Sequence, residues 1–105
     1  MTILAAELVK AEKTLLYVVP EAKTAEVRVL VTNTGTDTTV NVWAVAKGGG
    51  AGKRHLLMSD FAIAASDSDM TALLVLDEGE SIYADSGNNI VAFQVVGRET
   101  FVKRR

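Results

Sequence analysis

The stretch Ala25-Glu-Val-Arg-Val-Leu-Val-Thr-Asn33 is followed by Thr34-Gly-Thr-Asp-Thr38 and then by Thr39-Val-Asn-Val-Trp-Ala-Val-Ala46. Both outer segments are rich in β-branched residues, which favour strands. The middle segment has the Gly, Asp and Thr composition of a turn. Two strand-like runs separated by a short turn predict a β-hairpin.

Alternation within these segments predicts which side of each strand is buried. Val27, Val29 and Val31 share one face of the first strand, and Val40 and Val42 share one face of the second. Successive side chains of a strand point to opposite sides of a sheet. The two valine stripes therefore indicate the wall of a hydrophobic core.

The rest of the chain repeats short apolar runs separated by turns. A chain of 105 residues fits one domain, and this spacing is typical of an all-β fold. We predict a single domain over 1–105, an antiparallel β-sandwich of jelly-roll type with about eight short strands. Further strands are expected at 13–19, around 61–63, and at 70–76, 81–84, 90–96 and 98–102, with a bulge at Gly97.

Three segments stand apart from this pattern. Residues 1–12 carry an approximate helical stripe, but the β character of the following sequence favours a strand or an extended N-terminal arm. Residues 47–53 contain four glycines and predict a flexible loop. The basic tail 103–105 reads as a solvated chain end.

Composition excludes several classes of protein. There is no cysteine, so disulfides and thiolate metal sites are ruled out. The net charge of −2 disfavours a nucleic-acid binder. No apolar run is long enough to cross a bilayer, and the N-terminus lacks the basic region of a signal peptide. We expect a soluble chain that is made in the cytoplasm, with no membrane partner and no specific nucleic-acid partner.

The sign of charge is unevenly distributed. Residues 56–97 contain seven acids and no Lys or Arg, whereas all 11 basic residues lie outside with the other six acids. This segment therefore carries a formal charge of −7 and the remainder +5. Either neighbouring strands mix the charges in the fold, or the surface has two signs that dock copies or partners.

Candidate chemistry is sparse. The loop that ends at Lys53 and Arg54 fails the phosphate-loop pattern, because the first Gly and the final Ser or Thr are absent. His55 is the only histidine and has no defined nucleophile beside it. Asp67 and Asp69 are expected to bond backbone amides in a turn, since a calcium site needs more oxygens. We predict no catalytic, cofactor-binding or metal-binding residues, no small-molecule substrate and no enzyme activity.

The outward stripes are more apolar than a solvated sheet face requires. If Val40 and Val42 face the core, Trp43 and Val45 face outward, and Leu30 does so between Arg28 and Thr32. Either loops cover these side chains, or another subunit does. The candidate interface residues are Leu30, Trp43, Val45, Lys53, Arg54 and Arg104.

The order of motifs resembles a pattern in small virion proteins of tailed bacteriophages. The matching elements are Leu15-Leu-Tyr-Val-Val-Pro20, the Ala22-Lys-Thr-Ala25 step, Val29-Leu-Val-Thr-Asn33, Val40-Asn-Val42, Leu74-Val-Leu-Asp-Glu-Gly-Glu-Ser-Ile82 and Val91-Ala-Phe-Gln-Val-Val-Gly97. The resemblance runs from about Leu15 to Glu99 and implies a β-sandwich of head decoration, neck and collar, or tail and fibre attachment. The family carries no catalytic residues to transfer.

From these observations we expect a non-enzymatic virion subunit that forms a homo-oligomer, a trimer or larger, and binds capsid, neck or tail proteins. Burial of the face bearing Trp43 would hold the oligomer, and complementary charge would set its register. The alternative is a host-surface carbohydrate-recognition module that stacks sugars on Trp43, Tyr17 or Tyr83.

Overall fold

Nine strands make up the regular structure of the described residues, and no helix occurs among them. The computed structural model describes residues 2–9, 12–47, 56–87 and 91–102. The strands are β1 (Thr2–Val9), β2 (Thr14–Val18), β3 (Lys23–Asn33), β4 (Thr38–Val45), β5 (Leu56–Ile63), β6 (Ser68–Met70), β7 (Leu74–Leu76), β8 (Ser81–Ser86) and β9 (Val91–Phe101).

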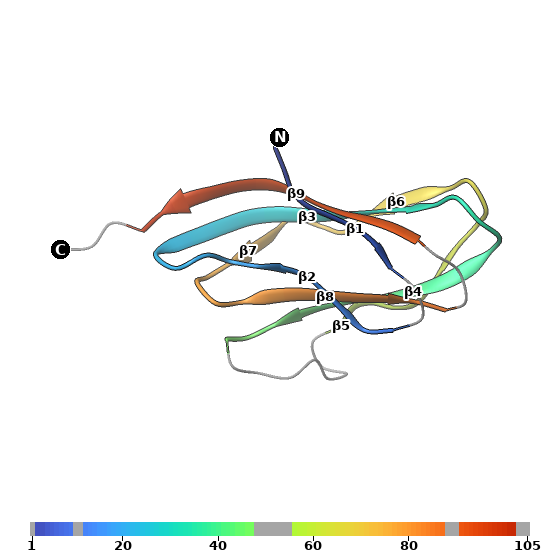
Figure 1. Cartoon of the computed structure of the whole chain (residues 1–105), viewed down its shortest axis with the longest axis horizontal. Coiled ribbons are helices and arrows are strands. Elements are labelled where there is room, and N and C mark those ends of the chain that lie inside the picture. Colours follow the sequence, from blue (N-terminus) through green and yellow to red (C-terminus); the bar gives the residue numbers. More distant parts are fainter. Residues whose placement is uncertain (1, 10–11, 48–55, 88–90, 103–105) are drawn as a thin grey trace.

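The strands form two antiparallel sheets packed face to face, which are the upper and lower layers of Figure 1. Sheet A has the order β1-β9-β3-β6, with β7 also paired to β3, and sheet B has the order β2-β8-β4-β5. If β6 and β7 are counted as one interrupted strand, this is the strand order of a jelly roll. The predicted antiparallel sandwich of about eight strands is confirmed.

The predicted hairpin between residues 25–33 and 39–46 is wrong. Strand β3 belongs to sheet A and β4 to sheet B, so the link between them crosses from one layer to the other. Sheets pack about 10 Å apart, a gap that four extended residues span. The Gly/Asp/Thr link is therefore an arch over the end of the core. The valine stripes on either side of it are opposite walls of that core.

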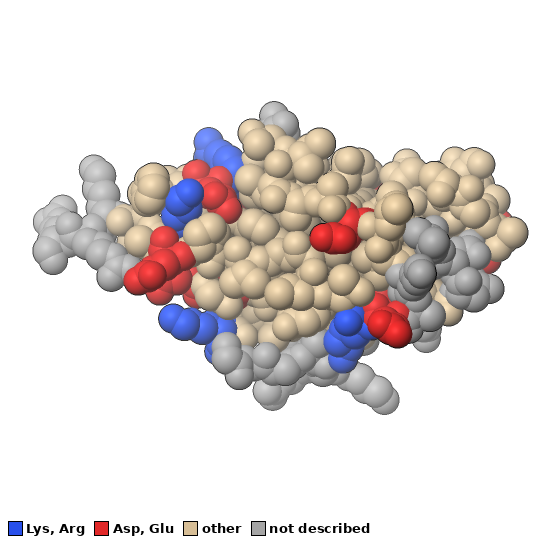
Figure 2. Space-filling view, in the orientation of Figure 1, with Lys and Arg blue, Asp and Glu red and all other residues tan. Residues whose placement is uncertain are grey.

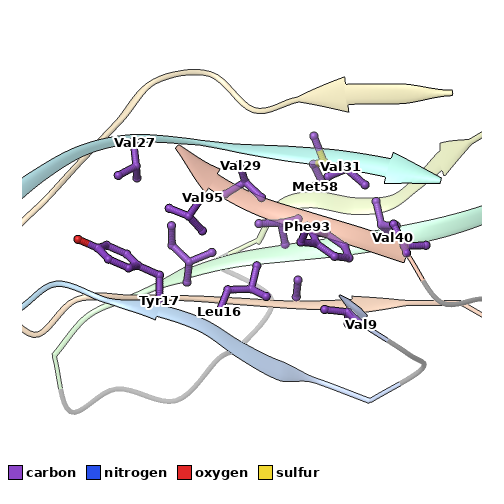
Figure 3. Close-up of a cluster of buried hydrophobic side chains, with 14 of the residues drawn as sticks. Val9, Leu16, Tyr17, Val27, Val29, Val31, Val40, Met58, Phe93 and Val95 are labelled. Carbon is purple, nitrogen blue, oxygen red and sulfur yellow. The ribbon is translucent and has the colours of Figure 1, made fainter. Parts of the chain in front are cut away.

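The core fills the space between the layers with small branched side chains. Val27, Val29 and Val31 of sheet A are fully buried, as are Val40 and Val42 of sheet B. In Figure 3 the labelled side chains of the two layers point toward one another around Phe93. Burying each such side chain stabilises the fold by about 1.5 kcal/mol or more. The predicted core stripes are thus confirmed.

Strand β9 pairs with β3 over eleven residues, from Lys23 opposite Phe101 to Asn33 opposite Val91. The register of this pair is continuous through Gly97, so the predicted bulge at this residue is wrong. Gly97 instead has φ +156°, and a Cβ there would lie 1.9 Å from the carbonyl oxygen of Glu26. The glycine is required by this close approach of two backbones.

The single strand predicted at 70–76 is interrupted. Met70 pairs with Leu30 in β6, and the chain returns to β3 only at Leu74 in β7. Between them the Thr71 amide donates to the carbonyl of Val29 at 3.0 Å, and the Thr71 hydroxyl accepts from the amide of Val29 at 3.0 Å. The Thr71 hydroxyl thus takes the place of a backbone carbonyl as the acceptor for the Val29 amide. The chain leaves the sheet after Thr71.

The N-terminal segment is an edge strand of sheet A. Residues Thr2–Val9 pair with β9, with an irregularity between Ile3 and Ala5. Leu4, within this irregularity, and Ala5, directly after it, both pack against the core. Of the readings considered for residues 1–12, a strand is correct for the described part. The flexible loop predicted at 47–53 lies outside the described residues except for Lys47. Strands β4 and β5, on either side of it, are neighbours in sheet B.

Candidate interaction surface

The edge where β1 and β2 lie together carries exposed apolar side chains. These strands end the two sheets on the same side of the sandwich, and they contact each other. Ile3 is 56% exposed and Leu8 70% on β1, while Leu15 is 46% and Val18 45% exposed on β2. We call these four side chains the edge patch. Ile3 and Leu8 lie on the outer face of sheet A and Leu15 and Val18 on that of sheet B, so these side chains border the edge from both sides. Large apolar side chains exposed on a protein surface mark a candidate interaction site.

This edge also has few charges. Glu7 is the only charged residue within β1 and β2. Natural proteins block exposed sheet edges with Lys, Pro or very short strands, and β1 has eight residues without Lys or Pro. Figure 2 shows a broad surface of uncharged residues across the middle and right of the molecule, interrupted by an acidic group, with the other charged side chains gathered toward the left and along the lower margin. The edge therefore offers both apolar contacts and unpaired backbone groups.

The outward residues of the predicted interface lie on opposite sides of the sandwich. Leu30 is half-buried on the outer face of sheet A, between Gln94 of β9 and Met70 of β6. Trp43 and Val45 belong to β4 in sheet B, where they alternate with the core residues of that strand. The three side chains therefore form no common patch.

The prediction that Trp43 and Val45 lie on an uncovered face is wrong. Trp43 is 8% exposed and Val45 2% exposed within the single chain. The ammonium of Lys13 lies over the indole ring, 4.8 Å from its centroid. The alternative interpretation, that other parts of the same chain cover these side chains, explains this apolar stripe. Lys53, Arg54 and Arg104 lie outside the described residues.

The aromatic residues considered for sugar stacking offer little free surface. Trp43 is enclosed, Tyr17 is 8% exposed, and Tyr83 is half-buried beside Trp43 in the sheet. Sugar stacking needs an accessible ring face. Trp43 and Tyr17 provide none, and Tyr83 is half-buried, so burial does not favour the carbohydrate-recognition alternative.

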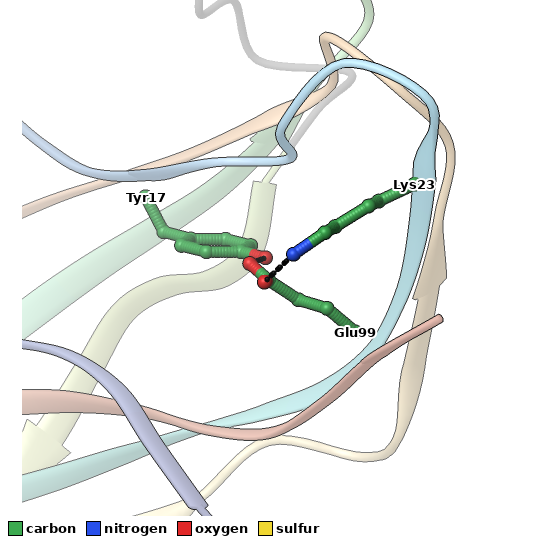
Figure 4. Close-up of polar contacts among 3 residues, drawn as sticks. All are labelled: Tyr17, Lys23 and Glu99. Atoms are coloured by element: carbon green, nitrogen blue, oxygen red, sulfur yellow. Dashed lines mark hydrogen bonds and ion pairs between the residues drawn. The ribbon is translucent and has the colours of Figure 1, made fainter. Parts of the chain in front are cut away.

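A polar cluster closes one end of the core. The Tyr17 hydroxyl of sheet B donates to Glu99 Oε2 at 2.5 Å, and the Lys23 ammonium donates to Glu99 Oε1 at 3.1 Å. Figure 4 shows these side chains converging from β2, β3 and β9. Lys23 also lies over the Phe101 ring, 4.7 Å from its centroid. The cluster links the two sheets.

The ionisation of this cluster follows from its contacts. Burial raises the pKa of Tyr17 above its usual value, and the adjacent Glu99 carboxylate raises it further. The hydrogen bond from Tyr17 lowers the pKa of Glu99, and Lys23 acts in the same direction. At neutral pH a neutral phenol therefore donates to an ionised carboxylate. This arrangement is a structural link, since no described cleft brings a substrate to it.

The residues considered for metal or catalytic chemistry are dispersed. Each carboxylate of Asp67 and Asp69 accepts the amide of the next residue, at 2.9 and 2.8 Å, which confirms their predicted bonding to backbone amides in the turn. The described residues hold no group of three or more His, Asp or Glu able to bind a metal. His55 and the phosphate-loop candidate around Lys53 lie outside the described residues.

A search for membrane-crossing helices found none of sufficient length and hydropathy among the described residues. Comparison of the chain with protein-family models, curated proteins and solved structures gave no match. The fold and the surfaces described above therefore carry the functional argument.

The edge patch was not predicted from the sequence. Each of its four residues falls in a predicted strand or in the predicted N-terminal arm. The sequence does not show that these two segments lie together at one edge of the sandwich. The signal was present in the lack of charge in residues 2–6 and 14–18. It became meaningful only when the topology placed β1 beside β2.

Proposed function

We propose that this chain is a non-enzymatic structural subunit of a tailed-bacteriophage virion. In this role it forms a homo-oligomer, a trimer or larger, and binds capsid, neck or tail proteins. The motifs between Leu15 and Glu99 support the virion assignment. The jelly-roll order is also one that viral capsid proteins use, although a fold by itself does not define a function.

The edge patch is the observation that carries the proposal. Its exposed apolar side chains on β1 and β2 would be covered by a neighbouring subunit. A ring of three or more copies needs a contact between two different surfaces. The edge patch supplies one of them. A stable contact also needs about 1,000 Å² in total, so surface beyond the four side chains takes part.

Localisation in purified particles tests the virion role. Particles of the phage that encodes this chain would be purified by density gradient, and their proteins identified and counted by mass spectrometry. We expect the chain in a fixed stoichiometry of three or more copies per particle, and immunogold labelling would place it on head, neck or tail. Its absence from infectious particles, with abundance in the infected cell, would overturn the virion assignment.

A further inference from the structure

The place that β1 takes beside β9, which we call the β1 slot, is required by the sandwich. Strand β9 contributes Val91, Phe93 and Val95 to the core, and each is at most 1% exposed. On the side away from β3, β9 pairs with β1. With this slot empty, β9 would become a bare sheet edge, and water would reach the core beside it. A strand with the sequence of β1 must therefore fill the slot.

The attachment of β1 to this slot is concentrated at its last residue. Val9 is 1% exposed, and its carbonyl accepts a hydrogen bond from the Ser86 hydroxyl of sheet B at 3.2 Å. Leu4 and Ala5 are partly buried, and the other five residues of β1 are exposed. The pairing with β9 is also irregular between Ile3 and Ala5. An edge strand with so few buried side chains separates from its sheet more readily than an inner strand does.

The short connection between β1 and β2 limits how far β1 can lie from the rest of its chain. Four residues, 10–13, separate the two strands, which belong to opposite sheets. The Cα atoms of Val9 and Thr14 can therefore be at most about 18 Å apart. A copy that placed β1 in the slot of a neighbour would have to bring its own β2 to that neighbour's β1/β2 edge. Leu15 and Val18, which are exposed in the single chain, would then lie against this edge and cover it.

We propose that copies of this chain exchange β1, so that each copy donates β1 to the slot of one neighbour and receives β1 from another. The occupant is a second copy because the slot already fits the sequence of β1. Exchange keeps the register between β1 and β9 and the hydrogen bond from Ser86 to Val9, both between chains. It adds cover for the edge patch, which a chain that retains its own β1 lacks.

This inference rests on the proposed homo-oligomer and supplies the two different surfaces that a ring needs. Strand β1 is the donated surface, and the slot beside β9 is the accepting surface. The β1/β2 edges of all copies would face the axis of the ring, because the connection of four residues keeps each donor close to its acceptor.

A pair of introduced cysteines tests whether β1 and the β9 beside it belong to the same chain. The chain contains no cysteine, and Ala6 lies opposite Gln94 in the register of β1 and β9, outside the edge patch. Opposite residues of antiparallel strands are about 5 Å apart, which suits a disulfide. Ala6→Cys/Gln94→Cys, oxidised in its native assembly, should give covalent species of three or more chains on a non-reducing denaturing gel. The matched control Thr32→Cys/Ala92→Cys joins β3 to β9 and should give single chains.

Sedimentation of the wild type and of each oxidised variant before denaturation separates the two claims. A native mass of three or more chains, with the Ala6→Cys/Gln94→Cys disulfide inside single chains, would overturn the exchange and leave the proposed oligomer intact. A wild type that sediments as a monomer would contradict the oligomer, and the exchange with it.

Chains that carry only Ala6→Cys, refolded together with chains that carry only Gln94→Cys, give a second readout with one substitution per chain. Exchange predicts disulfides between the two kinds of chain. An absence of such disulfides in assemblies of wild-type mass would overturn it.

Discussion

At Gly97 the backbone of β3 lies too close to β9 to leave room for a side chain. A Cβ at this residue would lie 1.9 Å from the Glu26 carbonyl oxygen and 2.8 Å from the Cα of Val27. Backbone atoms cannot give way as the end of a flexible side chain can. The eleven-residue pairing of the two strands therefore depends on a residue without a side chain.

Replacing Gly97 by alanine should lower the free energy of unfolding by about 2 kcal/mol or more, because the backbone must leave a positive φ or the strands must separate. Denaturant unfolding measures the change. Gly87→Ala is the matched control, since its Cβ would meet the Thr38 hydroxyl oxygen at 3.0 Å and no positive φ is required. Equal losses in the two variants would contradict the close-approach argument.

The hydrogen bond from Tyr17 to Glu99 makes stability depend on pH. The pKa of Glu99 is lowered in the fold, so its contribution is complete above the ordinary value of 4.5 and is lost as pH falls through the folded value. The pKa of Tyr17 is raised in the fold. The contribution of Tyr17 to stability is therefore complete below pH 10.0 and is lost as the pH rises above that value.

We expect Tyr17→Phe to cost about 1 kcal/mol of stability at pH 7, because a hydrogen bond to a charged group is lost at a partly exposed site. The difference in stability between Tyr17→Phe and the wild type should shrink below pH 4.5 and above pH 10. Thermal unfolding across pH measures it. Tyr83→Phe is the control, since no hydroxyl bond of Tyr83 occurs in the described part of the chain. Identical pH profiles for wild type and Tyr17→Phe would refute the link.

At the scale of elements, the arch between β3 and β4 is held by one buried amide. The Asn33 side-chain nitrogen donates to the carbonyls of Thr36 at 2.7 Å, Ile63 at 3.1 Å and Ala64 at 3.3 Å. Its side-chain oxygen accepts the amide of Gly35 at 3.0 Å. The residue thus ties the arch to the end of β5 and fixes the crossing between layers.

Asn33→Ala should destabilise the fold by about 2 kcal/mol, because it leaves buried carbonyls without donors. The matched control is Asn41→Ala on β4, where the amide is half-buried and donates to Asp85 at 2.8 Å. That loss should be about 1 kcal/mol or less. Urea unfolding of both variants gives the comparison, and an Asn33→Ala variant as stable as Asn41→Ala would argue against the arch as a fixed element.

The arch also explains how far the sequence predicted the fold. A valine stripe indicates which side of a strand is buried, and those predictions were correct for Val27 and Val42. It contains no information about which strand lies alongside, so the hairpin was predicted where β3 in fact pairs with β9, far along the chain. The break after Thr71 was missed for a related reason, because its hydroxyl bond to β3 exists only in the folded sheet.

At the scale of the whole molecule, the sandwich is elongated, with principal extents of 51 × 28 × 19 Å. The uneven charge of the sequence left two readings open, mixing of charges between neighbouring strands or a surface with two signs. Of the ion pairs among the described residues, that between Lys47 and Glu78 joins the acidic segment 56–97 to a base outside it. The edge patch lies apart from such pairs, so apolar and charged contacts can be separated by experiment.

Added salt should weaken self-association by several-fold between low and high ionic strength, because charge contacts between copies are screened within about 10 Å at 0.1 M and about 3 Å at 1 M. The apolar part of the contact persists. Sedimentation velocity at a series of salt concentrations measures the dissociation constant. A constant value would show that the uneven charge plays no part in assembly, while leaving the edge patch intact.

The most direct test of assembly through the β1/β2 edge is the solution mass of Leu8→Lys beside Val75→Lys. The two residues are equally exposed at 70%, on opposite edges of sheet A. Sedimentation equilibrium should give a mass of three or more times 11.2 kDa for wild type and Val75→Lys. Leu8→Lys should shift toward the single chain, with association weakened about tenfold or more. A monomeric wild type, or equal masses for the two variants, would contradict assembly through this edge.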